Sequence, residues 1–267
     1  MNDFDFEGRT VVVTGASVGI GAAFARELDA RGCRLVLVAR GREKLEALAS
    51  QLKNAQVLVE DLATPGAARR VFEEVERRGL AVDVLINNAG FGVFSPFGDA
   101  SLESQRGQID LNISALVELT HVFMPMLERR RGGLIQVASL AAYQPTPYSA
   151  VYGATKAFVL SFSEALWAEY KDRGVRVVTL SPGATDTQFF VRAGEHASKG
   201  VKRVRPEGVA RLGLDAFQKN RPSVIYGFAN SVLSFSLRLF SRAFVLKMMA
   251  RLTAPRPSSR PATAHQT

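Results

Sequence analysis

Short apolar runs alternate with longer amphipathic segments through the first 180 residues, and this alternation restricts the possible folds most. The apolar runs are nearly continuous in Val, Leu and Ile, as in parallel strands covered on both faces, and lie at 10–14, 34–39, 56–60, 84–87, 133–138 and 175–181. Helical segments separate them, at 19–31, 42–52, 65–78, 102–130 and 151–173. We therefore expect an α/β fold with a doubly wound parallel sheet in three α/β/α layers. A later run at 223–226 could add one more strand.

Positive charge is concentrated at the C-terminal end of the chain. The net charge is +9, yet no Asp or Glu follows Asp215, whereas eight Lys and Arg residues do. Those eight account for nearly the whole excess, so the preceding part is close to neutral. We expect a single catalytic domain over 1–227, two basic amphipathic helices over 228–254, and a disordered tail over 255–267 that is rich in Pro, Ser, Thr and Arg.

The sequence also indicates the compartment. Its single cysteine, Cys33, excludes an intrachain disulfide framework, and we expect a buried, unreactive thiol at a strand start. The acidic N-terminus lacks a secretory pattern, and no apolar run reaches the about 20 residues that a membrane span needs. We expect a cytoplasmic protein that can lie peripherally on a membrane surface.

A glycine-rich turn joins the first expected strand to the first expected helix. Residues 14–21 read Thr-Gly-Ala-Ser-Val-Gly-Ile-Gly. Glycine lets the backbone approach a pyrophosphate closely, and the N–H groups at a helix N-terminus attract its negative charge. A plain tight turn is the alternative, but the position inside a βαβ unit favours a Rossmann-type dinucleotide site.

The end of the second expected strand indicates which dinucleotide binds. Folds that prefer NAD carry an acidic residue there, which bonds the ribose hydroxyls. This strand is followed instead by Arg40, which can pair with a 2′-phosphate through charge-assisted hydrogen bonds. NADP(H) is therefore favoured, and NAD(H) remains possible. The alternative is that Arg40 is only a surface residue at a strand end.

Tyr152 and Lys156 lie four residues apart at the start of the fifth expected helix, so they share a helix face. An ammonium and an oxidised nicotinamide would both lower the phenol pKa from its usual value of about 10. Ser139 ends the preceding strand, at the sheet edge where ligands bind, and could hold a substrate oxygen beside the phenol. Singly, these residues read as a solvated helix face and a strand cap, and Asn112 reads as a surface amide.

In combination, the motifs resemble the short-chain dehydrogenase/reductase family, in its shorter, single-domain branch. They follow the family's order: TGASVGIG at 14–21, Asp61-Leu62, Asn87-Asn88-Ala89-Gly90, Asn112, Ser139, YGATK at 152–156, and Pro182-Gly183 with Thr187. The resemblance implies an oxidoreductase that transfers a hydride between nicotinamide and a carbonyl or secondary alcohol. It implies homo-dimers or homo-tetramers formed through the long fourth and fifth helices. No metal site and no nucleic-acid partner are expected.

The resemblance also assigns roles to residues. Tyr152 would be the general acid/base, Ser139 would orient the substrate, Lys156 would tune the phenol and bind ribose, and Asn112 would hold a proton-relaying water. Asp61 and Leu62 would flank the adenine, and Pro182, Gly183 and Thr187 would hold the carboxamide. The implied cofactor-binding set is Gly15, Ser17, Gly19, Ile20, Gly21, Arg40, Asp61, Leu62, Asn88, Ala89, Gly90, Tyr152, Lys156, Pro182, Gly183 and Thr187. Val18 stands where many NADP-using members carry a basic residue, so phosphate recognition would depend mainly on Arg40.

Substrate class is indicated only indirectly. Residues 188–205 would close over the substrate, and four phenylalanines are candidate pocket walls or ordinary packing residues: Phe91, Phe94, Phe189 and Phe190. The basic helices over 229–252 could dock on the domain and narrow the pocket, or lie on an anionic membrane. An apolar or lipid-like small-molecule substrate is the resulting hypothesis.

Two other functions remain open from the sequence. A sugar-nucleotide epimerase-type enzyme also uses Tyr-x-x-x-Lys, but such chains usually carry Gly-x-x-Gly-x-x-Gly, whereas the spacing here is Gly-x-x-x-Gly-x-Gly. A non-catalytic dinucleotide-binding sensor or scaffold would not need the full set of Asn112, Ser139, Tyr152 and Lys156.

Overall fold

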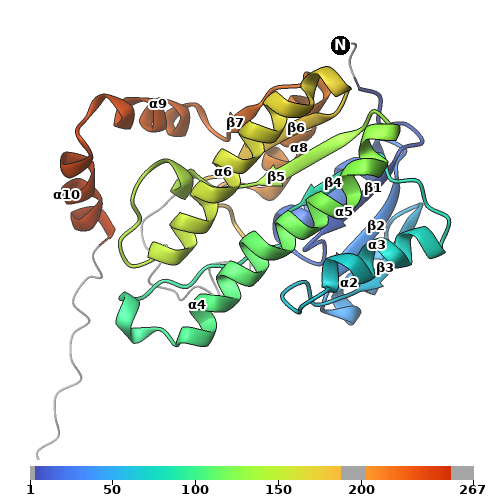
Figure 1. Cartoon of the computed structure of the whole chain (residues 1–267), viewed down its shortest axis with the longest axis horizontal. Coiled ribbons are helices and arrows are strands. Elements are labelled where there is room, and N and C mark those ends of the chain that lie inside the picture. The colour runs from blue at the N-terminus through green and yellow to red at the C-terminus, as the bar shows by residue number, and fades with distance from the viewer. Residues whose placement is uncertain (1–3, 188–202, 254–267) are drawn as a thin grey trace, which may run out of the picture.

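One parallel sheet forms the centre of the molecule. The computed structural model describes residues 4–187 and 203–253. The strand order is β3-β2-β1-β4-β5-β6-β7, and every neighbouring pair is parallel. The strands are β1 (Thr10–Thr14), β2 (Arg34–Ala39), β3 (Ala55–Val59), β4 (Val84–Asn87), β5 (Gly133–Val137), β6 (Arg176–Ser181) and β7 (Ser223–Ile225). The expected Rossmann-type α/β fold is confirmed, including the seventh strand (Figure 1).

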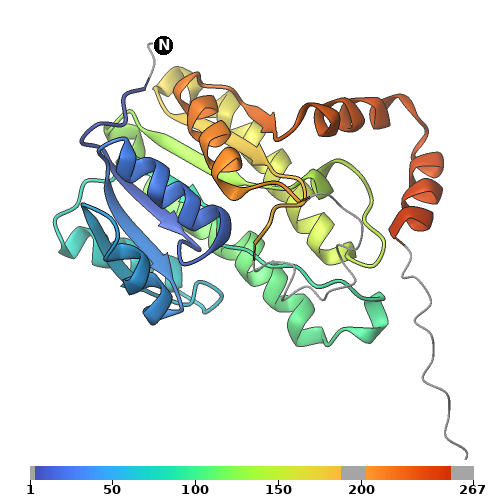
Figure 2. The same ribbon diagram turned by 180° about the vertical axis from the view of Figure 1, so that it is seen from behind.

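Helices cover both faces of this sheet. The bounds are α1 (Gly19–Ala30), α2 (Arg42–Ala49), α3 (Ala67–Arg77), α4 (Leu102–Ile109), α5 (Ala115–Arg129), α6 (Ala150–Tyr170), α8 (Pro206–Gln218), α9 (Phe228–Ser236) and α10 (Arg242–Thr253). Side chains of α1, α2 and α8 pack into one apolar core, and those of α3, α5 and α6 into another on the opposite face. Figure 2 shows the layers from behind.

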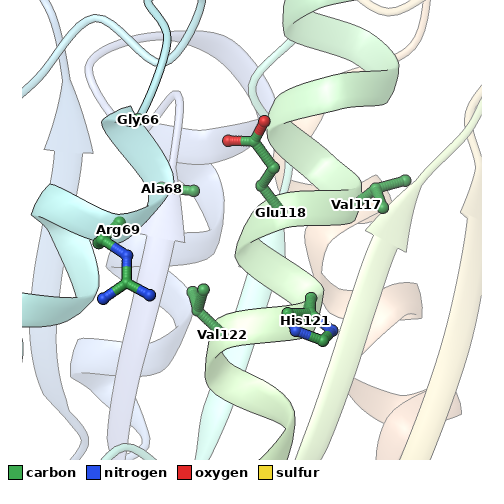
Figure 3. A pocket seen from close by; sticks show the side chains of 7 residues that line it. All are labelled: Gly66, Ala68, Arg69, Val117, Glu118, His121 and Val122. Carbon is green, nitrogen blue, oxygen red and sulfur yellow. The ribbon is translucent and has the colours of Figure 1, made fainter.

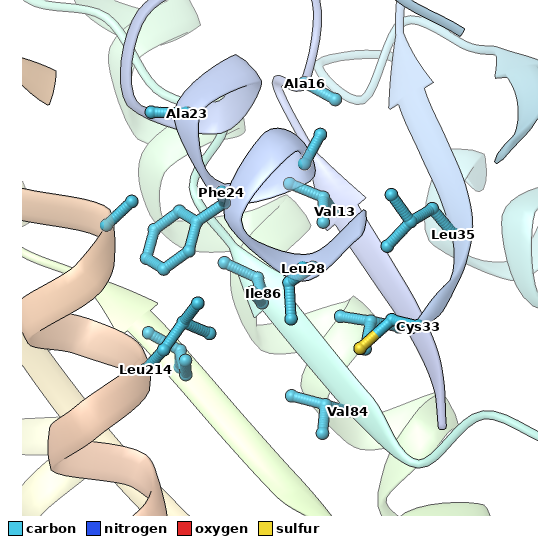
Figure 4. Close-up of a cluster of buried hydrophobic side chains, with 14 of the residues drawn as sticks. Val13, Ala16, Ala23, Phe24, Leu28, Cys33, Leu35, Val84, Ile86 and Leu214 are labelled. Atoms are coloured by element: carbon cyan, nitrogen blue, oxygen red, sulfur yellow. The ribbon is translucent and has the colours of Figure 1, made fainter. Parts of the chain in front are cut away.

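The first core contains the only cysteine. Phe24 and Leu28 of α1 meet Leu214 of α8 over the sheet, and Cys33 lies at their edge (Figure 4). The Cys33 thiol donates to the Phe6 carbonyl at 3.2 Å. Burial raises the pKa of this thiol to about 12, which keeps it protonated and unreactive. The expectation of a buried structural thiol is confirmed.

The expected single helix over 102–130 is interrupted. A π-helical segment, η2 (Asp110–Ser114), separates α4 from α5. A π-turn inserts an extra residue into a helix and changes the direction of its side chains. Asn112 lies inside this turn and is 1% exposed, so the composition-based reading of a surface amide was wrong. The helix expected over 151–173 also ends earlier, at Tyr170, and passes into a 3₁₀ turn.

The chain continues after β7 into α9 and α10. Gly227, with a left-handed φ of +97°, directly precedes α9. The two helices expected in the basic region are present, and the tail expected at 255–267 lies outside the described residues. None of the described helices is both long and apolar enough to span a bilayer.

Candidate active site

The functional motifs follow four neighbouring strands. Strands β1, β4, β5 and β6 are adjacent in the sheet, and the motifs lie just beyond their carboxyl ends. Because the strands are parallel, these ends meet at one edge, where ligands of open α/β sheets bind. The fold therefore brings the glycine turn, residues 88–90, Ser139 and Pro182-Gly183 together.

The glycine turn is held against the end of β4. Thr14 Oγ1 accepts the N–H groups of Asn88 and Ala89, both at 3.0 Å. Asn88 Nδ2 donates to the Thr14 carbonyl at 2.8 Å. Gly15 has a φ of +62°, and a Cβ there would lie 2.9 Å from the Ala89 Cα. Only glycine fits this contact, so the turn and residues 88–90 pack directly against each other.

The N-terminus of α1 fits a phosphate group. Val18 is the N-cap, no side chain caps the helix, and its first turn contains no acidic residue. The first N–H groups of such a helix need partners, and the helix dipole favours an anion. Gly19 has a φ of +59°, and a Cβ there would come 2.8 Å from the Thr187 methyl. The predicted residues Ser17 and Ile20 are half-buried beside it, and Gly21 is buried.

Arg40 follows β2 directly and is largely exposed. Its guanidinium lies 3.9 Å from the Asp61 carboxylate, with 63% of the Arg40 side chain accessible. An exposed pair at this distance contributes about 0–1 kcal/mol, so Arg40 can exchange Asp61 for another anion at little cost. Leu62 is buried in the core beneath α3, which leaves only its backbone for an adenine.

Tyr152 is buried next to Ser139. A side-chain hydrogen bond joins the two hydroxyls, and burial raises the Tyr152 pKa to about 12, with the Ser139 bond acting in the opposite direction. The Phe94 ring lies 5.9 Å from the Tyr152 ring, centroid to centroid. From the sequence, Lys156 is expected to lower the Tyr152 pKa, but in the chain alone desolvation dominates because the phenol is enclosed.

Lys156 and Asn112 complete the cluster. Lys156 Nζ donates to the Val137 carbonyl at 2.8 Å and lies 5.9 Å from the Tyr152 ring centroid. Burial lowers the Lys156 pKa to about 8. The Asn112 amide bonds the Phe91 backbone in both directions, at 3.1 and 2.9 Å. These contacts place both side chains behind Gly90, where a Cβ would lie 2.9 Å from Asn112 Oδ1.

Two supporting residues were not among the predicted set. Thr14 links the glycine turn to β4, as described above. Thr155 Oγ1 accepts from Asn112 Nδ2 at 3.0 Å and donates to the Tyr152 carbonyl at 2.7 Å. Both hydroxyls are buried. A threonine within an otherwise apolar strand or helix was the signal by which the sequence could have indicated them. Among the candidate pocket walls, Phe91 packs near Gly107 of α4, and Phe189 and Phe190 lie outside the described residues.

The residues predicted to hold the carboxamide contact the segment after β5 and the C-terminal region. The Pro182 carbonyl accepts the Leu140 N–H at 2.8 Å. Asn230 Nδ2 lies 2.8 Å from the position of a Cβ on Gly183. Pro182, Gly183 and Thr187 therefore lie between Ser139, the start of α1 and the root of α9.

A separate shallow hollow lies between α3 and α5 (Figure 3). Its lining is mostly small or aliphatic, with one histidine, one basic and one acidic side chain: Gly66, Ala68, Arg69, Val117, Glu118, His121 and Val122. It includes none of the predicted catalytic or cofactor residues, so we assign it no part in the chemistry.

Comparisons with known proteins agree with this geometry. A family model described as short chain dehydrogenase matches residues 9–198. Serine 3-dehydrogenase of Agrobacterium fabrum is 32% identical over 210 residues, which cover 75% of this chain and 84% of the relative. A solved structure from a study of 7β-hydroxysteroid dehydrogenase stereoselectivity matches with a TM-score of 0.82 at 27% identity, covering 94% of this chain and all of that one. A short-chain dehydrogenase from Sphingobium yanoikuyae in complex with NADPH matches with a TM-score of 0.79 at 29% identity, covering 95% and 99%. The chain belongs to the short-chain dehydrogenase/reductase family of NAD(P)-dependent oxidoreductases.

Proposed function

We propose that the chain is an NADP(H)-dependent reductase of apolar carbonyl compounds, which also oxidises the corresponding secondary alcohols. The observation that carries this proposal is the buried hydrogen bond between Tyr152 and Ser139. It joins a proton donor to a second hydroxyl at the sheet edge that also bears the uncapped start of α1. A dinucleotide whose phosphates lie at α1 would extend toward this pair.

The residues of this chain supply the proton side of the reaction. When bound, a reduced nicotinamide supplies the hydride. Ser139 donates a hydrogen bond to the carbonyl oxygen, and Tyr152 transfers its proton to that oxygen as the carbonyl carbon receives the hydride. The product is a secondary alcohol, and Tyr152 is left as phenolate. Lys156 stabilises that phenolate. A proton relayed past Asn112 and through Lys156 then regenerates the phenol.

The two pKa shifts describe the protonation states from which reduction would start. Burial raises the Tyr152 pKa to about 12, so the phenol holds its proton at neutral pH and is ready to donate it. Burial lowers the Lys156 pKa to about 8, so this ammonium gives up a proton more readily than an exposed lysine. Because the Lys156 ammonium is then a stronger acid than the Tyr152 phenol, a proton can pass from Lys156 to the Tyr152 phenolate after each reduction.

The preference for NADP(H) rests on Arg40. It stands where NAD-preferring folds carry an acidic residue, and its weak pair with Asp61 leaves the guanidinium available. The NADPH complex of the Sphingobium relative supports this assignment. Asp61 and the Leu62 backbone would then border the adenine.

An apolar substrate is supported from two directions. The Phe94 ring packs beside the Tyr152 ring, and one structural relative comes from work on a hydroxysteroid dehydrogenase. Steroids are rigid, apolar alcohols and ketones, which a phenylalanine-lined pocket would accommodate.

The outer face of α6 supports a homo-oligomer. Phe158 and Phe162 of α6 stack at 5.6 Å between ring centroids, and Phe158 is exposed. An exposed ring stacked on a half-buried one on a long helix would be covered in a dimer. We therefore propose that α6 forms part of the contact between copies, together with the preceding long helix α5 as the family resemblance implies.

Consumption of NADPH and of NADH against a panel of apolar ketones tests the proposal. Wild-type protein should turn over NADPH, and Tyr152→Phe should lower kcat by about 10²–10⁴. Tyr170→Phe, at the far end of the same helix, is the matched control and should behave as wild type. Undiminished turnover by Tyr152→Phe would refute the mechanism. Dinucleotide binding without turnover would favour the sensor function, and consumption of a nucleotide sugar would favour the epimerase.

A further inference from the structure

The last two helices extend beyond the sheet. Residues 228–253, here called the C-terminal arm, leave the domain at the β7 edge (Figures 1 and 2). Helix α9 contacts β7 and the 3₁₀ segment η3 (Leu140–Tyr143). Asn230 Nδ2 donates to the Tyr226 carbonyl at 2.8 Å. The root of the arm is therefore fixed to the domain.

Helix α9 presents its apolar side to solvent. Asn230, Ser234 and Leu237 follow each other at helical spacing on the inner side, with Ser234 and Leu237 buried and Asn230 half-buried. The Ser234 hydroxyl has no hydrogen-bond partner among the described residues. On the opposite side, Phe228 and Phe235 are 86% and 66% exposed. A helix stabilised only by its own domain would bury its phenylalanines against the domain and expose its polar residues to solvent.

Helix α10 combines aromatic and cationic side chains on one face. Phe244, Lys247 and Arg251 share this face at helical spacing and are exposed, and the exposed Phe240 lies in extended backbone just before the helix. The Phe240 and Phe244 rings stack at 5.1 Å between centroids. Only Val245 of this helix is buried among the described residues. Aromatic rings beside Lys and Arg are the composition of helices that lie in a membrane interface.

Exposed apolar residues are concentrated in the arm. Nine of the thirteen large hydrophobic side chains found exposed in the described residues belong to it: Phe228, Val232, Leu233, Phe235, Leu239, Phe240, Phe244, Leu246 and Leu252. The sequence has no acidic residue after Asp215, so every charge on the arm is positive. The surface is therefore complementary to a partner that is both apolar and anionic.

We propose that the C-terminal arm docks on an anionic lipid bilayer. The acyl layer would take up the apolar side chains, and the headgroups would pair with Arg242, Lys247 and Arg251. Charge complementarity selects this partner over a second copy of the arm. Two such surfaces brought together would place like charges opposite each other, which opposes association.

The root of the arm connects this surface to the active site. Helix α9 contacts the segment that begins directly after Ser139, and Asn230 lies against Gly183. A docked arm would hold the substrate side of the domain beside the bilayer. On the proposed reductase function, the substrate class is then a carbonyl lipid dissolved in the membrane.

Vesicle co-sedimentation of the full chain tests the docking. Wild type should sediment with phosphatidylcholine vesicles that contain phosphatidylglycerol, and less with phosphatidylcholine alone. Lys247→Glu/Arg251→Glu should weaken binding by at least about tenfold. Lys219→Glu/Arg221→Glu makes the same charge change on exposed residues in the turn between α8 and β7, and it should bind as wild type. Equal loss in both variants, or no sedimentation of wild type, would overturn the proposal.

A second pair of variants separates docking from self-association. Phe228→Ser/Phe235→Ser removes exposed rings without touching the core, and it should release the protein from vesicles and leave its oligomeric state in solution unchanged. If it converts an oligomer to monomers and wild type ignores vesicles, the arm binds a second copy and the proposal fails.

Turnover distinguishes the lipid substrate from the reductase function itself. Wild type should reduce a long-chain ketone held in vesicles, and the Lys247→Glu/Arg251→Glu variant should do so at least about tenfold more slowly. Both should reduce a small water-soluble ketone equally. Vesicle binding without turnover of either ketone would refute the proposed function but not the docking. Equal turnover of the vesicle ketone by both proteins would refute the lipid substrate alone.

Discussion

Helix α1 and helix α9 have similar apolar content but use it oppositely. In α1, Phe24 and Leu28 are fully buried between the sheet and α8, while the helix N-terminus carries no side-chain cap. In α9, Phe228 and Phe235 face solvent and the polar Ser234 is buried. The difference shows that helical periodicity predicts a helix, whereas the partner of its apolar face depends on the surrounding molecule.

The largest expected effect contrasts the two helices directly. Phe24→Ala should lower the free energy of unfolding by about 3–5 kcal/mol because it leaves a cavity in the core. Phe235→Ala should change it by less than about 0.5 kcal/mol because the ring is already in water. Denaturant unfolding of both variants measures this. A similar loss in both would mean that the arm is covered in solution.

A second comparison concerns a buried lysine and an exposed one. The Lys156 pKa falls from 10.5 to about 8 in the folded chain. Between those pH values the unfolded chain holds more protons, so the free energy of unfolding should rise with pH across this window. Relative to Lys156→Met, the wild-type rise should amount to about 2–3 kcal/mol.

Unfolding measured at a series of pH values between 8 and 10.5 checks this expectation. Lys247→Met, on the exposed face of α10, controls for the loss of a lysine charge as such. Parallel profiles for wild type and Lys156→Met would show that burial does not perturb Lys156.

The smallest expected effect separates two sets of exposed cations. Arg40→Ala should weaken NADPH binding about tenfold, or about 1.4 kcal/mol, by removing one charge-assisted contact to the 2′-phosphate. NADH binding and vesicle binding should not change. Lys247→Ala/Arg251→Ala should weaken vesicle binding and leave the binding of both dinucleotides unchanged. Fluorescence titration with both dinucleotides measures the first variant, and an unchanged NADPH-to-NADH ratio would assign the phosphate to another residue.

The sequence predicted the sheet well because parallel strands are continuous apolar runs with helices between them. It also predicted that Ser139, Tyr152 and Lys156 come together, since they lie where a strand end and a helix start meet; their catalytic roles stay a prediction. It could not predict the π-turn at Asn112, because that turn depends on the contacts of its amide with Phe91 and Thr155. The high Tyr152 pKa could not be predicted either, because it results from burial of the phenol among residues far away in the sequence, such as Phe94.

The direction of α9 was equally inaccessible. Its spacing indicated an amphipathic helix, but the buried side is determined by attachment at Tyr226 and contact with η3. Two interpretations left open by the sequence, docking on the domain and lying on a membrane, therefore apply to opposite faces of the same arm in our proposal.

The central claim is that hydride transfer to a carbonyl depends on the Tyr152 proton. Reduction of an apolar ketone with NADPH that carries deuterium at the transferring position of its nicotinamide tests this most directly. Wild type should give an alcohol with one deuterium on the former carbonyl carbon, and Tyr152→Phe should form it at least about a hundredfold more slowly. An alcohol without deuterium, or an unchanged rate in the variant, would contradict the account.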